Sequence, residues 1–210
     1  AASFSRCSLR LRQAGLSGLT RQFSQVSGLN DVVIVSAVRT PVGSFLSSLS
    51  PLKAPQLGAV AIKAAVEKAG IGSDDVQEVY MGHVCQGGAG QSPARQATLF
   101  AGLPDKTEAS TINKVCASGM KSAMLASQSL MCGHREVMVA GGMESMSNVP
   151  YYMARGQSPY GGVNLQDGIV LDGLTDVYNK FHMGCCAEDT AKKFDISRAD
   201  QDAYAINSYK

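Results

Sequence analysis

A cysteine at the predicted junction between a strand and a helix is the residue best placed to do chemistry. Cys116 follows a short apolar segment, residues 111–115, and opens a predicted helix over residues 116–132. Free N–H groups and the macrodipole at a helix N-terminus favour a thiolate, the nucleophilic form of cysteine. The dipole contributes only about 0.3–1 kcal/mol, so a base is still required. The pattern indicates a nucleophile, and an inert buried cysteine is the alternative.

The helix behind Cys116 is predicted to be buried on nearly all sides. Residues 117–132 contain one charged side chain, Lys121, and many small residues. A cysteine at the start of such a helix would face an enclosed site and not bulk water.

The remaining cysteines and histidines are predicted to be structural. The six cysteines form no CxxC pair and no Cys/His metal spacing, so most are expected to be reduced, buried and small. The vicinal pair Cys185 and Cys186 is expected in the core. His83, in a glycine-rich loop, and His134, in a helix-ending turn, are expected to cap or to lie on the surface.

Strands and helices alternate along residues 31–140. A fully buried strand is predicted at 31–38 and a helix at 54–69, stopped by Gly70. A strand at 76–81, a helix at 93–100, the segment around Cys116 and a strand at 136–140 follow. This order implies an α/β fold with a largely parallel sheet and helices on both faces.

The chain changes character after Gly142. Residues 143–180 are rich in Gly, Tyr, Ser and Pro, and are too long and irregular for an ordinary connection. They are interpreted as an inserted functional loop region. A helical pattern returns at 183–194, and a capping box at 197–200 opens a last helix.

The N-terminal segment differs from the rest in charge. Four arginines (Arg6, Arg10, Arg12, Arg21) precede the first acidic residue, Asp31, which is typical of a mitochondrial transit peptide over residues 1–28; a disordered basic tail is the alternative. The net charge is +2, and −2 without these arginines, so no nucleic-acid partner is indicated. The longest apolar run, 32–38, has the length of a strand, so no membrane partner is indicated.

Four segments together resemble one family. The decapeptide 112–121, Ile-Asn-Lys-Val-Cys-Ala-Ser-Gly-Met-Lys, is similar to the acyl-enzyme signature of thiolases, and the likeness extends over 38–45, 86–97 and 141–147. These segments occur in the family's order, and the resemblance covers essentially everything after residue 30. The amino-acid sequence around Cys116 is most similar to that of the mitochondrial acetoacetyl-CoA branch of the family.

The resemblance implies a fold and a division into domains. It implies a thiolase fold with an N-terminal α/β domain over residues 29–146 and the start of an inserted CoA-binding loop domain over 147–210. The C-terminal half of such an enzyme is not in this sequence.

The resemblance also implies a reaction. Two acetyl-CoA molecules would be condensed to acetoacetyl-CoA and CoA, or the reverse, through an acetyl group on Cys116. The N–H of Cys116 would be one donor of an oxyanion hole. No covalently bound cofactor is expected, because the substrates are CoA thioesters. A homotetramer in the mitochondrial matrix, with a role in ketone-body, isoleucine and fatty-acid metabolism, would follow.

Three further residues receive binding roles from the resemblance. His182 and Met183 would line the acyl and pantetheine pocket, with a simple helix-start histidine as the alternative. Tyr209 would contact CoA and help to hold a potassium ion, with a solvated helix tyrosine as the alternative.

Two other functions remain open. A 3-ketoacyl-CoA thiolase of fatty-acid oxidation shares the nucleophile but accepts longer chains. A truncated, non-catalytic thiolase fragment is the other possibility, because the family's Gly-His-Pro and Asn-Glu-Ala-Phe segments and its second catalytic cysteine do not occur here. This chain alone is therefore expected to be inactive.

Overall fold

The structure is a computed structural model that describes residues 28–156 and 159–210. Most of the predicted transit peptide, residues 1–27, lies outside the described residues.

A parallel sheet forms the centre of the α/β part. Its three strands are β1 (Glu78–Gly82), β2 (Glu108–Ile112) and β3 (Met138–Gly142), in the order β2-β1-β3. Glu78 of β1 lies opposite Glu108 of β2 and opposite Met138 of β3. These strands were predicted at 76–81, 111–115 and 136–140, so the predicted parallel sheet is confirmed and its boundaries are shifted by a few residues.

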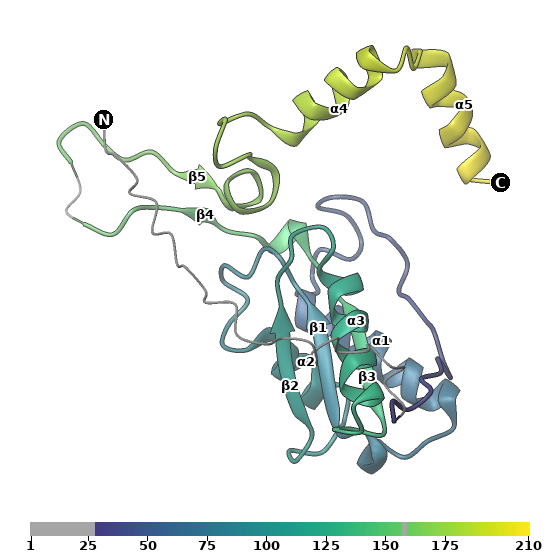
Figure 1. Ribbon diagram of the computed structural model, residues 1–210. Helices are drawn as coiled ribbons and strands as arrows, with labels where there is room; N and C mark the ends of the chain where they lie inside the picture. Colours follow the sequence, from purple (N-terminus) through teal and green to yellow (C-terminus); the bar gives the residue numbers. More distant parts are fainter. Residues whose placement is uncertain (1–27, 157–158) are drawn as a thin grey trace, which may run out of the picture.

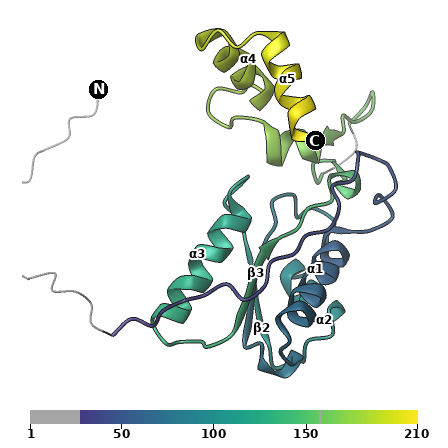
Figure 2. The same cartoon turned by 90° about the vertical axis from the view of Figure 1, so that its right-hand side faces the viewer.

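Helices cover both faces of this sheet. Helix α3 (Ser118–Met131) lies on one face, and α1 (Ala54–Ala69) with α2 (Pro93–Phe100) lies on the other (Figure 1, Figure 2). A 3-10 turn, η1 (Ser73–Asp75), connects α1 to β1. The predicted α/β class with helices on both faces is confirmed.

Helix α1 begins and ends where its residues dictate. Gln56 returns its side chain to the N–H of Lys53 at 2.8 Å, which satisfies a free donor of the first turn. Gly70 ends the helix with a φ of 70°, a left-handed conformation that costs glycine little. Ile62 and Val66, four residues apart, point into the core.

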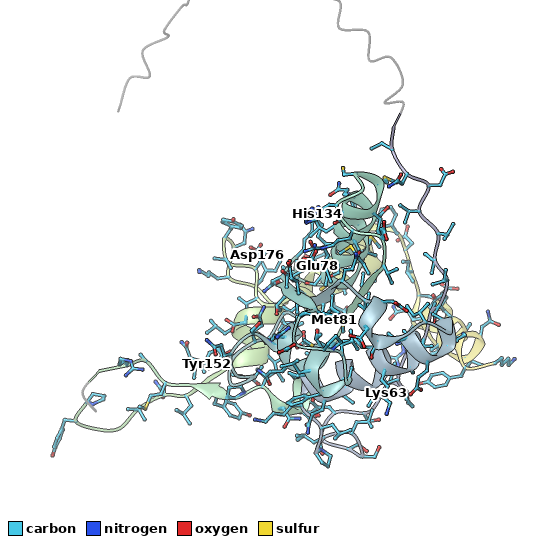
Figure 3. All side chains as sticks on the ribbon, turned by 90° about the horizontal axis from the view of Figure 1, so that it is seen from below. Lys63, Glu78, Met81, His134, Tyr152 and Asp176 are labelled. Carbon is cyan, nitrogen blue, oxygen red and sulfur yellow. The ribbon has the colours of Figure 1, made fainter. Side chains whose placement is uncertain are left out.

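The main core lies between α1, α2 and the sheet. Met81 of β1, labelled in Figure 3, is 2% exposed. Burial of a side chain of this size stabilises the fold by about 1.5–3 kcal/mol. The other members are small or aliphatic, and include Ile62, Val66, Val76, Val79, Ala94, Ala97 and Leu103.

The strand predicted at 31–38 does not form. This segment pairs with no described strand, and Val33, Ile34 and Val35 are 75%, 88% and 69% exposed. The central strand β1 already has a neighbour on each edge, so a further strand could pair only with an outer edge. The segment instead runs outside the β3 side of the sheet (Figure 2).

The prediction that α3 is buried nearly all round is also wrong. Only Ser118, Ser122 and Ala126 are buried, and Met120 is 71% exposed. The narrow sheet covers one stripe of the helix, so the opposite stripe faces solvent. The helix ends at Met131 and is capped by Cys132, which is followed by Gly133 in the left-handed region.

Beyond β3 the chain leaves the α/β layers. A 3-10 turn, η2 (Met146–Asn148), leads to the antiparallel pair β4 (Tyr151–Tyr152) and β5 (Gln166–Asp167), and a π-helix, η3 (Ile169–Leu174), follows. Tyr152, labelled in Figure 3, lies on this arm.

The last two helices are α4 (Met183–Lys193) and α5 (Arg198–Ser208). The capping box between Ser197 and Asp200 is confirmed. Neither helix has a buried residue, so Cys185 is exposed and Cys186 half-buried, contrary to the core position predicted for them. No helix in the described part of the chain has the length and apolar character needed to cross a bilayer.

Candidate active site

Cys116 lies in the turn that joins β2 to α3. Strand β2 ends at Ile112 and α3 begins at Ser118, so the cysteine precedes the helix by two residues. Among the residues that the structure describes, none donates to or accepts from the Cys116 thiol, and the Cys116 N–H donates no hydrogen bond. The thiol is exposed and not enclosed as expected.

The residue before Cys116 has an uncommon backbone conformation. Val115 has a φ of 48°, in the left-handed region, which is a genuine outlier for a β-branched side chain. Such a conformation costs about 1–3 kcal/mol and persists only where the surroundings hold it.

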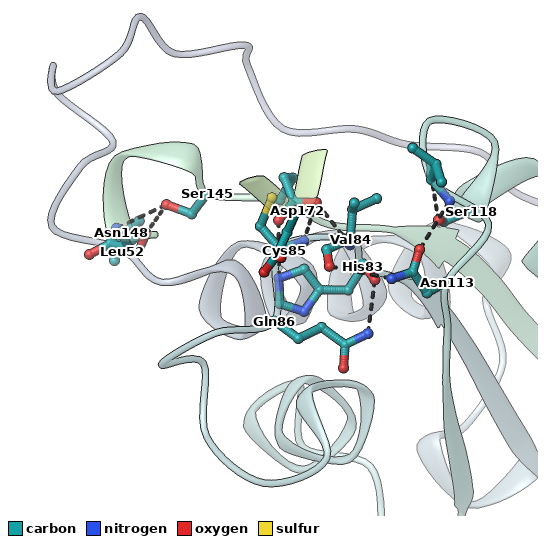
Figure 4. A network of polar contacts seen from close by, with 12 residues as sticks. Leu52, His83, Val84, Cys85, Gln86, Asn113, Ser118, Ser145, Asn148 and Asp172 are labelled. Atoms are coloured by element: carbon teal, nitrogen blue, oxygen red, sulfur yellow. Dashed lines mark hydrogen bonds and ion pairs between the residues drawn. The ribbon is translucent and has the colours of Figure 1, made fainter. Parts of the chain in front are cut away.

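Two neighbouring side chains bind the backbone around Val115. Asn113 Oδ1 accepts the Val115 N–H at 3.0 Å. Ser118 Oγ accepts the Lys114 N–H at 2.8 Å and donates to the Val115 carbonyl, which also accepts the Ser118 N–H at 3.0 Å. Figure 4 shows Asn113 and Ser118 at this turn.

Glycines allow the first turn of α3 to rest directly on the sheet. A Cβ on Gly82, at the end of β1, would lie 2.5 Å from the Gly119 nitrogen and from the Ser118 carbonyl carbon. Gly142, at the end of β3, faces Gly119 in the same way, with a hypothetical Cβ 3.3 Å from the Gly119 Cα. The helix start therefore contacts the carboxyl ends of two strands, backbone to backbone.

His83 is a buried residue and not the surface or capping residue that was predicted. It is 2% exposed, and its Nε2 lies 3.1 Å from Glu144 Oε1. Glu144 Oε2 also accepts the N–H groups of Val84 at 3.0 Å and of Cys85 at 3.4 Å. The loop after β1, shown in Figure 4, is thus joined to the segment that follows β3.

The electrostatics of this pair centre on Glu144. Burial is the largest single influence and would raise the pKa of Glu144. The hydrogen bonds from His83, Val84 and Cys85 together outweigh it and lower the pKa below the ordinary value of 4.5. Glu144 is therefore ionised at neutral pH and acts as an acceptor.

Cys85, the buried cysteine beside this pair, is a poor nucleophile. Burial, followed by the negative charges of Glu144, Asp172 and Asp167, raises the pKa of its thiol to about 11. The Cys85 thiol therefore stays neutral.

Tyr152 lies nearby and donates a hydrogen bond to Asp172 at 2.7 Å. Burial together with this hydrogen bond raises the pKa of Tyr152 to about 12.

The comparison with known families decides the class of this chain. Residues 32–210 match the family described as thiolase, N-terminal domain. The chain belongs to the thiolase family.

Relatives of known name agree with this. The thiolase chain is 68% identical over 189 residues to "Acetyl-CoA acetyltransferase, mitochondrial" of Homo sapiens, covering 90% of this chain and 44% of that protein. It is 72% identical over 181 residues to the Xenopus tropicalis protein of the same name, covering 86% and 43%. The chain thus spans less than half the length of these relatives.

A solved structure shows the same fold. The Acat5 thiolase from Ascaris suum, crystallised in complex with coenzyme A, superposes with a TM-score of 0.82 at 44% identity. The match covers 86% of this thiolase chain and 47% of the Ascaris chain.

The residues predicted to bind substrate lie on the last two helices. His182 caps α4, and its Nδ1 accepts the Gly184 N–H at 2.8 Å. Met183 is the first residue of α4 and is partly exposed. Tyr209 follows α5 and is 95% exposed. In the described ranges, no hydrogen bond or ion pair joins α4 or α5 to the turn that holds Cys116.

The described residues of this thiolase chain do not fit a potassium site. The Tyr209 hydroxyl has no polar contact with any residue described, and one exposed phenol is not a coordination sphere.

A hollow of about 290 Å³ lies between α1 and α2 and is lined by Gln56, Lys63 and Phe100. Cys116 does not line this hollow.

Sequence reasoning assigned no role to Glu144, Asn113 or Ser118. Glu144 had a visible signal, because it is a charged residue two positions after β3, within the 141–147 segment. Asn113 and Ser118 belong to the decapeptide that was singled out, but their role depends on the conformation of Val115, which side-chain type alone disfavours.

Proposed function

We propose that this thiolase chain supplies the nucleophile of an acetyl-CoA C-acetyltransferase, and that Cys116 carries the acetyl group. The observation that supports the proposal most directly is the position of Cys116. It lies in an exposed turn before α3, and its N–H donates a hydrogen bond to none of the described residues. A helix start presents such groups to developing negative charge.

In the proposed reaction, the Cys116 thiolate attacks the carbonyl carbon of acetyl-CoA. The new C–S bond forms, the CoA thiolate leaves, and the Cys116 N–H donates to the oxyanion in between. A second acetyl-CoA loses a methyl proton to a base, and its carbanion attacks the acetyl carbonyl carbon. The bond from this carbon to the Cys116 sulfur then breaks, which releases acetoacetyl-CoA and returns Cys116 as a thiolate. The proton acceptors are expected from family segments that this sequence does not contain, because no titratable side chain among those described contacts Cys116.

CoA thioesters are the proposed substrates. Relatives are named acetyl-CoA acetyltransferases, and the Ascaris neighbour was crystallised with coenzyme A. Residues 147–210 are proposed to begin the CoA-binding region, with His182, Met183 and Tyr209 toward the ligand. A tetrameric assembly remains part of the proposal, and a preference for longer acyl chains is the competing specificity.

Covalent labelling tests the nucleophile. The intact protein, given radiolabelled acetyl-CoA without an acceptor, should hold one acetyl group at Cys116, and Cys116→Ser should remove it. Cys132→Ser, at an exposed cysteine on the other end of α3, is the matched control and should keep the label. Label that survives in Cys116→Ser would refute the proposal.

The proposed location is the mitochondrial matrix, supported by the mitochondrial names of the relatives and by the acid-free segment 1–28. Removal of residues 1–28 should leave the protein in the cytosol. A protein from purified mitochondria that still begins at Ala1 would contradict cleavage of this segment.

A further inference from the structure

The turn before α3 contains a conformation that its own residue type disfavours. Val115 is left-handed, although valine avoids this region and glycine enters it freely. Something must therefore hold it there, and both polar groups of its backbone are occupied. Its N–H donates to Asn113 Oδ1 at 3.0 Å, and its carbonyl accepts from Ser118.

The two side chains act from opposite ends of the turn. Asn113 directly follows β2, and its Nδ2 also reaches the Val84 carbonyl at 3.4 Å, in the loop that Glu144 binds. Ser118 is 3% exposed and opens α3, and its hydroxyl joins Lys114 and Val115. Because α3 rests on Gly82 and Gly142, its start cannot shift to relax the turn.

We infer that Asn113 and Ser118 are positioning residues that hold Val115 in its left-handed conformation and thereby set the direction of the Cys116 thiol and N–H. The catalytic part of this inference rests on the proposed function of Cys116. Neither side chain is assigned a contact with substrate, so the inference concerns the rate of acyl transfer and not the affinity for acetyl-CoA.

Single-turnover kinetics of the intact protein test the inference. Asn113→Ala and Ser118→Ala should each slow acetylation of Cys116 at saturating acetyl-CoA by about 10–100-fold, because small misplacements of a reacting group cost rates of this order. The half-saturating acetyl-CoA concentration should change by less than about 2-fold. Asn113→Asp, which keeps the acceptor for the Val115 N–H, should retain most of the rate.

Ser122→Ala is the matched control for Ser118→Ala. Ser122 lies one turn later on α3, is also buried, and donates to the Ser118 carbonyl, so its replacement removes a buried hydroxyl but leaves the hydrogen bonds of Lys114 and Val115 in place. Its acetylation rate should stay within about 2-fold of the parent. A loss equal to that of Ser118→Ala would show a general packing effect and would overturn the inference for Ser118.

Relief of the backbone strain separates positioning from mere stability. Glycine adopts a left-handed conformation without help, so in a Val115→Gly background the loss caused by Asn113→Ala should shrink to about 3-fold or less. An undiminished loss in that background would overturn the inference. If Ser118→Ala fails to fold, the exposed Asn113 series still decides the question.

A readout that does not need thiolase chemistry keeps the two hypotheses apart. Alkylation of Cys116 by iodoacetamide, measured by mass spectrometry against Cys132 in the same molecule, should slow by at least about 3-fold in Asn113→Ala, because a displaced thiolate loses the helix N-terminus. If the parent is never acetylated, the proposed function fails and alkylation alone decides the inference. Unchanged alkylation and acetylation in both alanine variants would refute it.

Discussion

Glu144 joins two loops that lie 60 residues apart in the sequence. Its carboxylate binds the N–H of Val84, the N–H of Cys85 and the ring of His83. Charge-assisted hydrogen bonds of this kind are roughly twice as strong as neutral ones. The residue therefore holds the loop after β1 against the end of β3, and Asn113 of the Cys116 turn reaches the same loop at the Val84 carbonyl.

Replacement of Glu144 by Gln should destabilise the intact protein by about 1–3 kcal/mol at pH 7, since the charge that strengthens these bonds is lost. The folded-state pKa of Glu144 is lowered from 4.5. Its contribution is therefore complete above about pH 4.5 and is lost as the pH falls through the lower folded-state value. Urea unfolding of parent and variant should show a gap that narrows at acid pH.

Glu136→Gln is the control for this prediction. Glu136 is exposed two residues before β3, and its side chain has no ion pair or hydrogen bond with the residues described. Its replacement should change the free energy of unfolding by less than about 0.5 kcal/mol at either pH. A gap between parent and Glu144→Gln that widened in acid would show that the carboxylate is not stabilised in the folded state.

At the scale of residues, the sequence indicated which side chain could do chemistry better than it indicated how residues are buried and which backbone conformation they adopt. The decapeptide singled out Cys116, and the helix start indeed follows it. His83 was misplaced because burial of a histidine depends on a partner, and its partner Glu144 lies far away in the sequence. The left-handed Val115 was missed because β-branching argues against that conformation.

At the scale of elements, the glycines in the contact between α3 and the sheet differ in how much space each has for a side chain. A Cβ on Gly82 would meet backbone atoms at 2.5 Å, and backbone cannot move aside as a flexible side chain can. A Cβ on Gly119, across the same contact, would find its nearest neighbours at 3.6 Å, an ordinary separation. Gly82 and Gly119 therefore differ in their tolerance of an added methyl group, although they belong to the same contact.

Gly82→Ala should destabilise the intact protein by about 1–3 kcal/mol, the usual cost of overpacking, and should slow acetylation of Cys116 by displacing α3. Gly119→Ala should not destabilise the protein, because the added methyl group meets only ordinary contacts and alanine favours the helix by up to about 1 kcal/mol. Thermal unfolding of the two variants measures the difference. Equal destabilisation by both would mean that the strand and helix are not in the contact described.

The elements themselves were predictable where local signals suffice. Gly70 after a periodic apolar segment placed the end of α1 correctly, and the capping box at Ser197 placed the start of α5. The segment 31–38 has the composition of a buried strand, but a strand forms only where the backbone aligns with an edge of the sheet, and in the described residues this segment does not align with the outer edge of β2 or β3. No local pattern reports this alignment.

At the scale of the whole molecule, much apolar surface faces solvent. It includes residues 33–35, the stripe of α3 with Met120 and Met124, and both α4 and α5, which bury no residue. Patches of this kind in a soluble protein mark surfaces that another part or partner covers. The relatives are more than twice as long as the matched region, so they contain chain that could do so.

Residues 29–210 expressed alone should therefore be aggregated or loosely packed and without thiolase activity. The absence of a general base alone costs about 10²–10⁴-fold in rate. Size-exclusion chromatography, thermal unfolding and the thiolysis of acetoacetyl-CoA measure the outcome. A soluble, cooperatively unfolding product that turns over acetoacetyl-CoA would refute this and would assign the base to His83, His134 or His182.

The pairing of the strands also determines when the sheet can form during synthesis of the chain. Glu78 pairs with Glu108 and with Met138, so the central strand waits for chain made 30 and then 60 residues later. At about 5–20 residues per second, the second neighbour of β1 arrives about 3–12 s after β1 itself. Throughout that interval β1 has an open edge and the valine-rich stretch at 32–35 is already free. Unpaired strand edges and exposed apolar segments make a nascent chain prone to aggregation until its strands have paired.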